Sequence, residues 1–287
     1  MIHKSNQTRT YRLRKRRQAS KFIGLLVMLC FILLPIIKRV TTDSTVYMDD
    51  MSDLQPSLHC NGLNITVPRI IWLFWDKGPK LAPNLQQACM KSWEIQNPEY
   101  ETIHLNLLTA EKLIRRKEKY KDDVWNNISI QAKSDIIRVE LLAKYGGVWV
   151  DATVRCNIPL IYWIEHITSV SHFFVFERTD LYITPAVRPH IASWFIASSN
   201  CSYIVQTLRK TIQHIWAKQP NPYQVYGYFW LHKVFLNLVK NDVTFFNAYT
   251  KMTFLSADGP HCREEGTWKM NKMTAVKCRK KYPKFGI

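Results

Sequence analysis

The chain has 287 residues, with 40 Lys and Arg against 22 Asp and Glu, and a formal net charge of +18 at pH 7. Its hydrophobic fraction of 47% and aromatic fraction of 13% exclude a largely disordered chain. Eight of the basic residues precede Phe22, where membrane topology explains them. The alternative, nucleic-acid binding through this basic arm, predicts a soluble nuclear protein, so we expect no nucleic acid among the partners.

An apolar segment follows the basic arm. Residues 22–37, "FIGLLVMLCFILLPII", are sixteen uncharged residues closed by Lys38 and Arg39. The pattern predicts a transmembrane signal anchor, with residues 1–21 as a cytosolic tail and the remainder in the lumen of the Golgi or endoplasmic reticulum. A cleaved signal peptide is the alternative because the apolar lengths of the two classes overlap. No clear small-x-small cleavage site follows Pro35.

A polar stem is predicted at 38–67, and the folded domain at 68–287. Three glycosylation sequons follow the predicted anchor, at Asn64, Asn127 and Asn200, and agree modestly with a lumenal location. An even number of cysteines follows the anchor, so an oxidising compartment could pair them, with the connectivity left open. These six are Cys60, Cys89, Cys156, Cys201, Cys262 and Cys278.

Strand and helix patterns alternate from Pro68 onward. The six-residue apolar run "IIWLFW" predicts a buried strand, and helical spacing from Asn84 predicts a helix that Asn97 and Pro98 end. The next predicted segments are a strand at 100–106, a charged helix at 109–120 opened by Thr109, and a helix at 134–145 capped by Ser134 and ended by Gly146.

After Asp151 the predicted elements are strands at 172–177 and 193–199, helices at 202–216 and 226–239, and a late strand at 252–257. We find no internal repeat and no linker long enough to separate a second domain. The order of elements predicts an α/β sheet covered by helices on both sides.

Three charged residues stand on otherwise apolar elements. Asp135 and Arg138 are three positions apart on one predicted helix, so their side chains share a face. Asp151 ends the strand that follows the Gly146-Gly147 turn, and we expect this turn to bring it beside the helix. The alternative for the helix pair is structural: an acid that favours the helix dipole, with a local ion pair.

Five segments in this order resemble the capsular polysaccharide synthesis protein family: "VPRIIWLFWDKG", "SWEIQNPEYETIHLN", "SDIIRVELLAKYGGVWVDATV", "SWFIASS" and "YFWLHKVF". The resemblance covers about residues 67 to 280, and the third segment is its most specific part. That family is related to glycosyltransferase family 32, a group of retaining sugar-nucleotide transferases. The resemblance implies a GT-A-like, Rossmann-like mixed sheet flanked by helices.

The resemblance also implies roles for individual residues. Trp75 would stack on the nucleotide base, although core packing is the alternative, and Trp72 is the better core candidate. Asp135 and Arg138 would contact the donor sugar. Asp151 would bind a divalent Mn or Mg ion that bridges the donor phosphates, a chemistry that suits a carboxylate and a hard cation. Thr153 takes the second acidic position of the "DxD" element, which weakens the metal site.

The carboxyl-terminal part of the chain supplies further candidates. His261 in "DGPHC" is a candidate metal ligand, although a single loop histidine is commonly unremarkable. In "NKMTAVK", which resembles a family "HKLTxK" element, Asn271 replaces the histidine. Lys272 and Lys277 would bind the departing diphosphate, and the alternative for this basic run is a solvated tail.

Three residues have weaker support. His232, on the helix predicted at 226–239, is favoured as a packed histidine over an acceptor-binding one. Glu177 and Asp180 follow an apolar strand and are candidates for the acceptor side, with no spacing to support either.

The sequence therefore predicts a single-pass type II membrane glycosyltransferase of the hexosyl or N-acetylhexosaminyl type. It would transfer a sugar from a nucleotide-sugar to a glycan or glycolipid hydroxyl, with retention implied by the resemblance alone. The alternative is a non-catalytic glycan-binding or accessory membrane protein that kept the fold, which Thr153 and Asn271 motivate.

Overall fold

The computed structural model describes residues 65–177, 191–218, 227–261 and 270–272. They all belong to Pro56–Ile287, one of two compact units into which internal contacts divide the chain. None of the helices in these ranges is long and apolar enough to cross a membrane. The predicted anchor at 22–37, the cytosolic tail and nearly all of the stem lie outside the described residues.

A five-stranded mixed sheet forms the centre of the fold, in the order β2-β1-β3-β6-β5. Strands β1, β2 and β3 run parallel, whereas β6 is antiparallel to both β3 and β5. The bounds are Ile70–Phe74 for β1, Glu101–Leu105 for β2, Gly147–Asp151 for β3, Phe173–Glu177 for β5 and Ile191–Ser198 for β6. The predicted α/β sheet is confirmed, and every one of its strands coincides with a predicted one.

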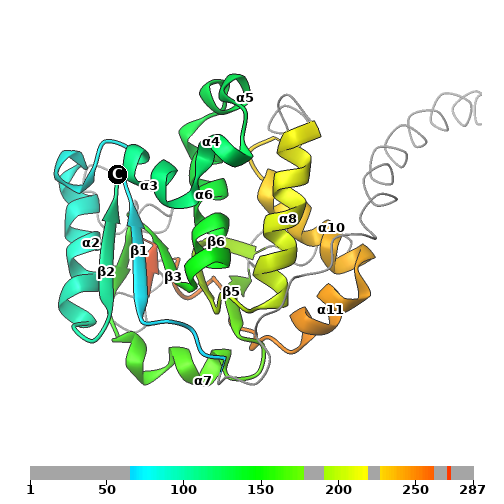
Figure 1. The fold of residues 1–287 in the computed structure, drawn as a ribbon. Helices are drawn as coiled ribbons and strands as arrows, with labels where there is room; N and C mark the ends of the chain where they lie inside the picture. The colour runs from blue at the N-terminus through cyan, green and yellow to red at the C-terminus, as the bar shows by residue number, and fades with distance from the viewer. Residues whose placement is uncertain (1–64, 178–190, 219–226, 262–269, 273–287) are drawn as a thin grey trace, which may run out of the picture. The chain divides into compact units, whose positions relative to one another are not determined.

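Helices cover both faces of this sheet (Figure 1). On one face lie α3 (Leu107–Ile114), α6 (Ile130–Tyr145), α8 (Tyr203–Lys218), α10 (Trp230–Asn241) and α11 (Val243–Thr250). The opposite face packs against α2 (Asn84–Gln96) and α7 (Ile164–Thr168). The remaining short helices are η1 (Pro79–Leu81), α4 (Arg116–Lys119), α5 (Asp122–Asn127) and η2 (Leu160–Tyr162).

The strand residues explain the two-sided core. Successive side chains of a strand point to opposite faces, so Trp72 and Phe74 enter the core under α6, while Ile71 and Leu73 enter the core under α2. Trp72 is only 2% exposed, which confirms that it is a core residue. Because both faces of β1 and β3 are apolar, these strands must lie at the centre of the sheet.

A small second sheet pairs β4 (Val154–Cys156) with β7 (Met270–Lys272) in antiparallel register. Neither strand was predicted, because each has only three residues and lacks a periodic pattern. The pairing places Lys272 opposite Val154, next to the turn that leaves β3. It therefore brings the carboxyl-terminal part of the chain to the end of the central sheet.

Three predicted helix starts are wrong: α10 begins at Trp230 instead of residue 226, and α3 and α6 begin earlier than predicted. Helix α3 begins at Leu107, and Asn106 caps it by accepting from the Thr109 amide at 2.8 Å. Helix α6 begins at Ile130, after Ser129 accepts from the Ala132 amide. For α3 and α6 an asparagine or serine upstream of the predicted cap supplies the side-chain oxygen that the first turn needs.

The late strand predicted at 252–257 is also wrong. Only an isolated bridge between Ser256 and Glu177 forms there. The Glu177 amide donates to the Leu255 carbonyl, and the Ala257 amide donates to the Glu177 carbonyl. The segment therefore lies at the end of β5 without extending the sheet, and α11 precedes it as a helix that was not predicted.

The cysteines do not all pair. Cys89 and Cys156 are buried free thiols, while Cys201 is disulfide-bonded. Burial raises the thiol pKa of Cys89 to about 12 and that of Cys156 to about 11, so both thiols are protonated at neutral pH. The remaining cysteines of the predicted set lie outside the described residues.

Candidate active site

The turn between α6 and β3 fixes the position of Asp151. Gly146 and Gly147 have φ values of 71° and 98°, which side-chain-bearing residues rarely adopt. A Cβ atom on Gly147 would lie 2.6 Å from the Ile70 carbonyl oxygen, so the chain needs glycine there to approach β1. The Trp72 indole donates to the Gly146 carbonyl at 2.8 Å and anchors the turn.

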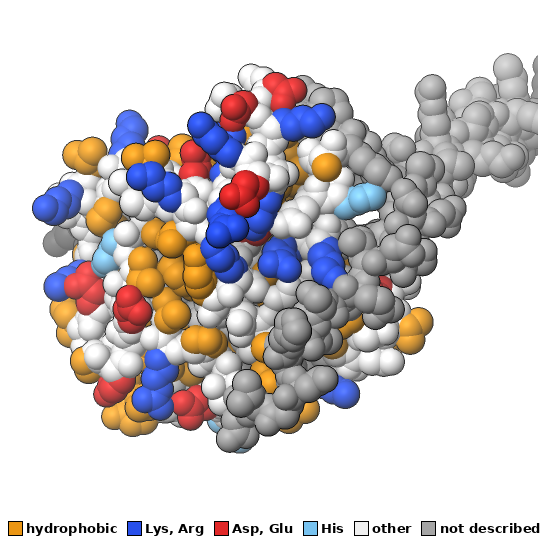
Figure 2. Space-filling view, viewed as in Figure 1, with side chains coloured by type: hydrophobic (Ala, Val, Ile, Leu, Met, Phe, Trp, Pro, Cys, Tyr) orange, Lys and Arg blue, Asp and Glu red, His pale blue; other side chains and the backbone are white. Residues whose placement is uncertain are grey.

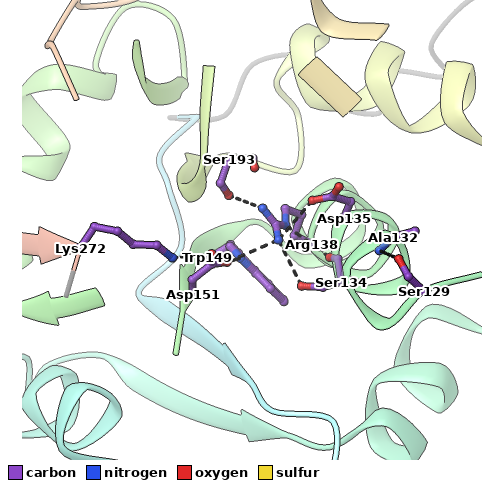
Figure 3. Close-up of polar contacts among 9 residues, drawn as sticks. All are labelled: Ser129, Ala132, Ser134, Asp135, Arg138, Trp149, Asp151, Ser193 and Lys272. Carbon is purple, nitrogen blue, oxygen red and sulfur yellow. Dashed lines mark hydrogen bonds and ion pairs between the residues drawn. The ribbon is translucent and has the colours of Figure 1, made fainter. Parts of the chain in front are cut away.

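Asp135, Arg138 and Asp151 converge at the carboxyl end of β3 (Figure 3). Arg138 Nη2 lies 3.2 Å from Asp135 Oδ1 and 3.4 Å from Asp151 Oδ1. The predicted convergence is confirmed, and one guanidinium links both carboxylates. The roles of these three residues in chemistry stay predictions.

Arg138 is held in place by further contacts. Its Nη1 donates to the Ser193 carbonyl at 2.6 Å, and its Nη2 donates to Ser134 Oγ at 3.1 Å. The guanidinium carbon also lies 5.2 Å from the centroid of the Trp149 ring, in cation–π geometry. These contacts come from α6, β3 and the start of β6, so the guanidinium has little freedom to move.

The dipole account of Asp135 does not hold. Because α6 begins at Ile130, Asp135 lies beyond its first turn, where the favourable effect of the helix dipole on an acid has faded. Its side chain is 12% exposed. A largely buried carboxylate in the interior of a helix needs another partner, and Arg138 supplies it.

Asp151 receives a second cation from the other side. Lys272 Nζ donates to Asp151 Oδ2 at 2.8 Å, and the Trp149 indole donates to Oδ1 at 3.0 Å (Figure 3). The Asp151 side chain remains 27% exposed. The cluster of Asp135, Arg138, Asp151 and Lys272, hereafter the edge cluster, is therefore reachable from solvent.

The two acids of the edge cluster have pKa values on opposite sides of normal. Burial would raise the pKa of Asp151, but the charges of Lys272 and Arg138 outweigh it and lower the value to about 2. For Asp135, burial prevails over the attraction of Arg138, and repulsion from Asp151 adds to it, so the pKa rises to about 6. Asp151 is ionised throughout the physiological range, whereas Asp135 changes its charge near its lower limit.

Trp230 is a further polar neighbour of Asp135. This first residue of α10 is fully buried, and its indole N–H has no hydrogen-bond partner of ordinary geometry. Its proximity to Asp135 helps to limit the rise in that pKa. The buried Trp230 indole therefore lies near Asp135, the acid of the edge cluster with the raised pKa.

The residues present do not fit the predicted divalent cation. Asp151 is a single carboxylate whose two oxygens already bind Arg138 and Lys272. Thr153 lies partly buried in the turn between β3 and β4, and a hydroxyl is a weak neutral ligand. Across the described ranges, no three His, Cys, Asp or Glu side chains form a group that could hold a metal ion. Within the described ranges, Asp151 therefore lacks the companion ligands that a divalent cation needs.

The structure places the other candidates as follows. Trp75 directly follows β1, whose last residue, Phe74, pairs with Asp151, so Trp75 lies at the same edge of the sheet, partly buried. His261 is 7% exposed and packs against Trp194, with ring centroids 5.8 Å apart. Lys277 and Asp180 lie outside the described residues, as does the side chain of Asn271.

Two acceptor-side candidates have structural contacts. Glu177 accepts a hydrogen bond from the Tyr249 hydroxyl, which connects β5 to α11. His232 packs edge-on against Phe229, with ring centroids 5.2 Å apart. Nothing in these contacts assigns either residue to an acceptor.

Sequence reasoning missed two contributors to the site, Trp149 and the Ser193 carbonyl, and it missed the contact that the predicted residue Lys272 makes with Asp151. Trp149 had a usable signal, because residues two apart on a strand share a face and Asp151 follows two positions later. The Ser193 carbonyl had none, since any residue supplies a carbonyl. The contact of Lys272 with Asp151 depends on the β4–β7 pairing. That pairing could not be predicted, because strands of three residues have no recognisable sequence pattern.

Comparison with known proteins identifies a family for the chain. The model of the capsular polysaccharide synthesis protein family matches residues 39–276. The chain belongs to this family. The match includes the whole edge cluster, so each of its four residues lies within the part of the chain that defines membership of the capsular polysaccharide synthesis protein family.

Two further similarities were found for this family member. The Aspergillus fumigatus protein named glycosyltransferase afumC is 35% identical over 94 residues, which are 29% of this chain and 24% of that protein. The matched region thus spans about a quarter of that relative. The solved structure of PaToxG glycosyltransferase is similar with a TM-score of 0.42 and 15% identity, over 64% of this chain and 74% of the other.

Proposed function

We propose that the chain is a glycosyltransferase that moves a sugar from a nucleotide-sugar donor to a hydroxyl of a glycan or glycolipid. The observation that carries the proposal is the edge cluster, which lies at the carboxyl ends of parallel strands, where open α/β sheets bind ligands. Family membership and the name of the A. fumigatus relative support the same reaction class.

Each residue of the site has a chemical role in this reaction. The Lys272 ammonium neutralises the diphosphate, because negative charge develops on its oxygen as the sugar leaves. Asp135 and Arg138 bind hydroxyl groups of the donor sugar, and Trp75 stacks on the base. Asp151 holds the two cations in place.

The bond changes follow from this placement. The bond from the anomeric carbon to the phosphate oxygen breaks, and its electron pair leaves with the diphosphate. The acceptor oxygen forms the new bond to that carbon, and its proton passes to the departing phosphate oxygen. We propose attack on the front face, which retains the configuration, because no carboxylate in the edge cluster is free of a cation partner to act as a nucleophile.

The proposal includes a GT-A-like fold and a location in the Golgi or endoplasmic reticulum lumen behind a type II anchor. The basic and apolar pattern of residues 1–39 supports that location. The resemblance also predicts a Mn or Mg ion bound by Asp151, Thr153 and His261, and the two cations already held by Asp151 argue against including it in the proposal. The type of sugar transferred, hexosyl or N-acetylhexosaminyl, is part of the proposal as well.

Turnover of nucleotide-sugars tests the proposal. The purified full chain is incubated with a panel of nucleotide-sugars, and release of nucleoside diphosphate is measured with and without glycan acceptors. We expect turnover of at least one donor, lowered by about 10²–10³-fold in Asp151→Asn. Asp123→Asn, the same change at an exposed site on α5, is the matched control and should retain activity. A folded wild-type protein that binds glycans but turns over no donor would support the non-catalytic alternative.

A further inference from the structure

Both oxygens of the Asp151 carboxylate hold a cation that belongs to the protein. Lys272 Nζ lies 2.8 Å from Oδ2, and Arg138 Nη2 lies 3.4 Å from Oδ1. The two cations approach from opposite sides, one from α6 and the other from β7 (Figure 3). A divalent ion at Asp151 would therefore have to displace one of them.

Lys272 is positioned by the backbone as well as by its charge. It pairs with Val154 in the β4–β7 sheet, and its amide donates to the Pro260 carbonyl at 2.7 Å. Met270, two residues earlier on the same strand, is fully buried and fixes β7 to the core. The Lys272 side chain is only 15% exposed, so its ammonium is held over the end of β3 instead of moving in solvent.

The local charges disfavour a further cation. Two positive groups, Arg138 and Lys272, lie beside two carboxylates, Asp135 and Asp151, so the edge cluster needs no additional positive charge to balance it. A metal ion at about 2.1 Å from the Asp151 oxygens would lie within a few ångströms of the ammonium and the guanidinium and be repelled by both. A diphosphate, in contrast, would be attracted to them.

We propose that the Lys272 ammonium occupies the cation position on Asp151 and neutralises the leaving diphosphate directly, so that sugar transfer by this chain needs no divalent metal. This inference rests on the proposed function and adds to it. During transfer the ammonium is shared between the Asp151 carboxylate and a phosphate oxygen. The electron pair of the breaking bond remains on that phosphate, and Lys272 keeps its proton.

Manganese binding tests the inference independently of turnover. Binding of Mn²⁺ to the full chain is measured by electron paramagnetic resonance. The proteins compared are wild type, the single variants Lys272→Met, Lys272→Arg and Asp151→Asn, and the double variant with both Lys272→Met and Asp151→Asn. Circular dichroism verifies that each variant is folded. We expect no Asp151-dependent Mn²⁺ binding in wild type or in Lys272→Arg, which keeps the cation.

Removing the ammonium should open the position. We expect Lys272→Met to gain a Mn²⁺ site that disappears when Asp151→Asn is added. Two results would overturn the inference: a Mn²⁺ site in wild type that Asp151→Asn removes, or no gain of binding in Lys272→Met. The second result would show that the ammonium is not what keeps a metal from Asp151.

Turnover supplies the second readout. Excess EDTA should leave wild-type donor turnover unchanged, while Lys272→Met should lower it by about 10²–10³-fold, the usual cost of losing one charge-stabilising donor. Loss of wild-type turnover in EDTA and its recovery on adding Mn²⁺ would contradict the inference. Failure of the proposed function would look different, because no donor would turn over at any metal concentration while the Mn²⁺ measurements would still be readable.

Discussion

Helix α6 carries two buried charge clusters that differ in one respect. The first is the edge cluster, where Asp151 is 27% exposed at the end of β3. The second cluster surrounds Glu140, which lies two residues after Arg138. The Glu140 side chain is fully buried. Glu140 accepts from Lys119 Nζ at 2.5 Å, the Tyr120 hydroxyl at 2.7 Å and Gln213 Nε2 at 2.5 Å. We call these four residues the Glu140 cluster.

The difference shows that a buried charge alone does not indicate a functional site. In the Glu140 cluster three donors saturate the carboxylate and connect α6 to α8 and to the end of α4, so no ligand can reach it. Burial, and then the charge of Glu140, raise the pKa of Tyr120 well above its usual value, which keeps that hydroxyl a donor. Figure 2 shows basic side chains gathered over the region of α4 and α6 with acids among them, as expected for a paired surface. The edge cluster instead opens at the sheet edge where a donor would bind.

The largest expected effect is on activity in the edge cluster. Asp151→Asn should lower donor turnover by about 10²–10³-fold, because the amide no longer holds Lys272 and Arg138 in place for the diphosphate. Steady-state kinetics on matched amounts of folded protein measures this change. A variant with full turnover would remove Asp151 from the mechanism.

The same chemical change should act on stability in the Glu140 cluster. Glu140→Gln should lower the free energy of unfolding by about 3 kcal/mol, since the fully buried carboxylate is lost and the partly buried Lys119 ammonium loses its counter-charge. Turnover per folded molecule should stay unchanged. Urea denaturation followed by tryptophan fluorescence measures the first quantity. A Glu140→Gln protein that is stable but inactive would show that the Glu140 cluster serves activity instead of stability.

Removing the lysine from each cluster sharpens the contrast. Lys119→Met should lower the free energy of unfolding by about 2 kcal/mol, through the lost hydrogen bond to a charged group. Unlike Lys272→Met, it should create no Mn²⁺ site, because Tyr120 and Gln213 still enclose the fully buried Glu140. Manganese titration of the two methionine variants side by side distinguishes them, and equal Mn²⁺ binding by both would contradict the comparison.

The smallest effect concerns pH. Turnover should fall as pH drops through about 6, where Asp135 takes up a proton and its attraction to Arg138 weakens. Asp135→Asn should lower turnover by about tenfold and abolish the inflection, as expected for the loss of one charged hydrogen-bond acceptor. A pH–rate profile of the two proteins tests this, and an unchanged inflection in the variant would assign it to another group.

The raised pKa of Asp135 also makes the stability of the fold depend on pH. Because Asp135 binds its proton more tightly in the folded protein, its contribution is fully present below pH 4 and is lost as pH rises through about 6. For Asp151 the sign is opposite: its contribution is present above pH 4 and is lost as pH falls toward about 2.

The sequence predicted the central sheet and the charged residues Asp135, Arg138 and Asp151, but not the contacts that surround these three residues. The strands of the central sheet were predictable because "IIWLFW" and "FFVF" are buried on both faces and leave continuous apolar runs. Asp135, Arg138 and Asp151 were predictable because helix spacing and a glycine turn are local signals. Lys272 contacts a residue 121 positions away through a strand pair that depends on tertiary packing, and no local pattern encodes it.

Glu140 shows the opposite failure. It lies within "RVELL", two residues after Arg138, yet its helix position does not reveal that Tyr120 and Gln213 enclose it. Helix starts were misplaced for a related reason, since Ser129 and Ser134 are equally good caps by residue type and only the packing of α6 selects between them.

The structure of the full chain with a bound nucleoside diphosphate tests the central claim most directly. We predict that the diphosphate lies within hydrogen-bond distance of Lys272 Nζ, above the carboxyl ends of β1 and β3, with the base against Trp75. A nucleotide bound away from this edge of the sheet, with Lys272 still bound to Asp151 and to no phosphate oxygen, would contradict it.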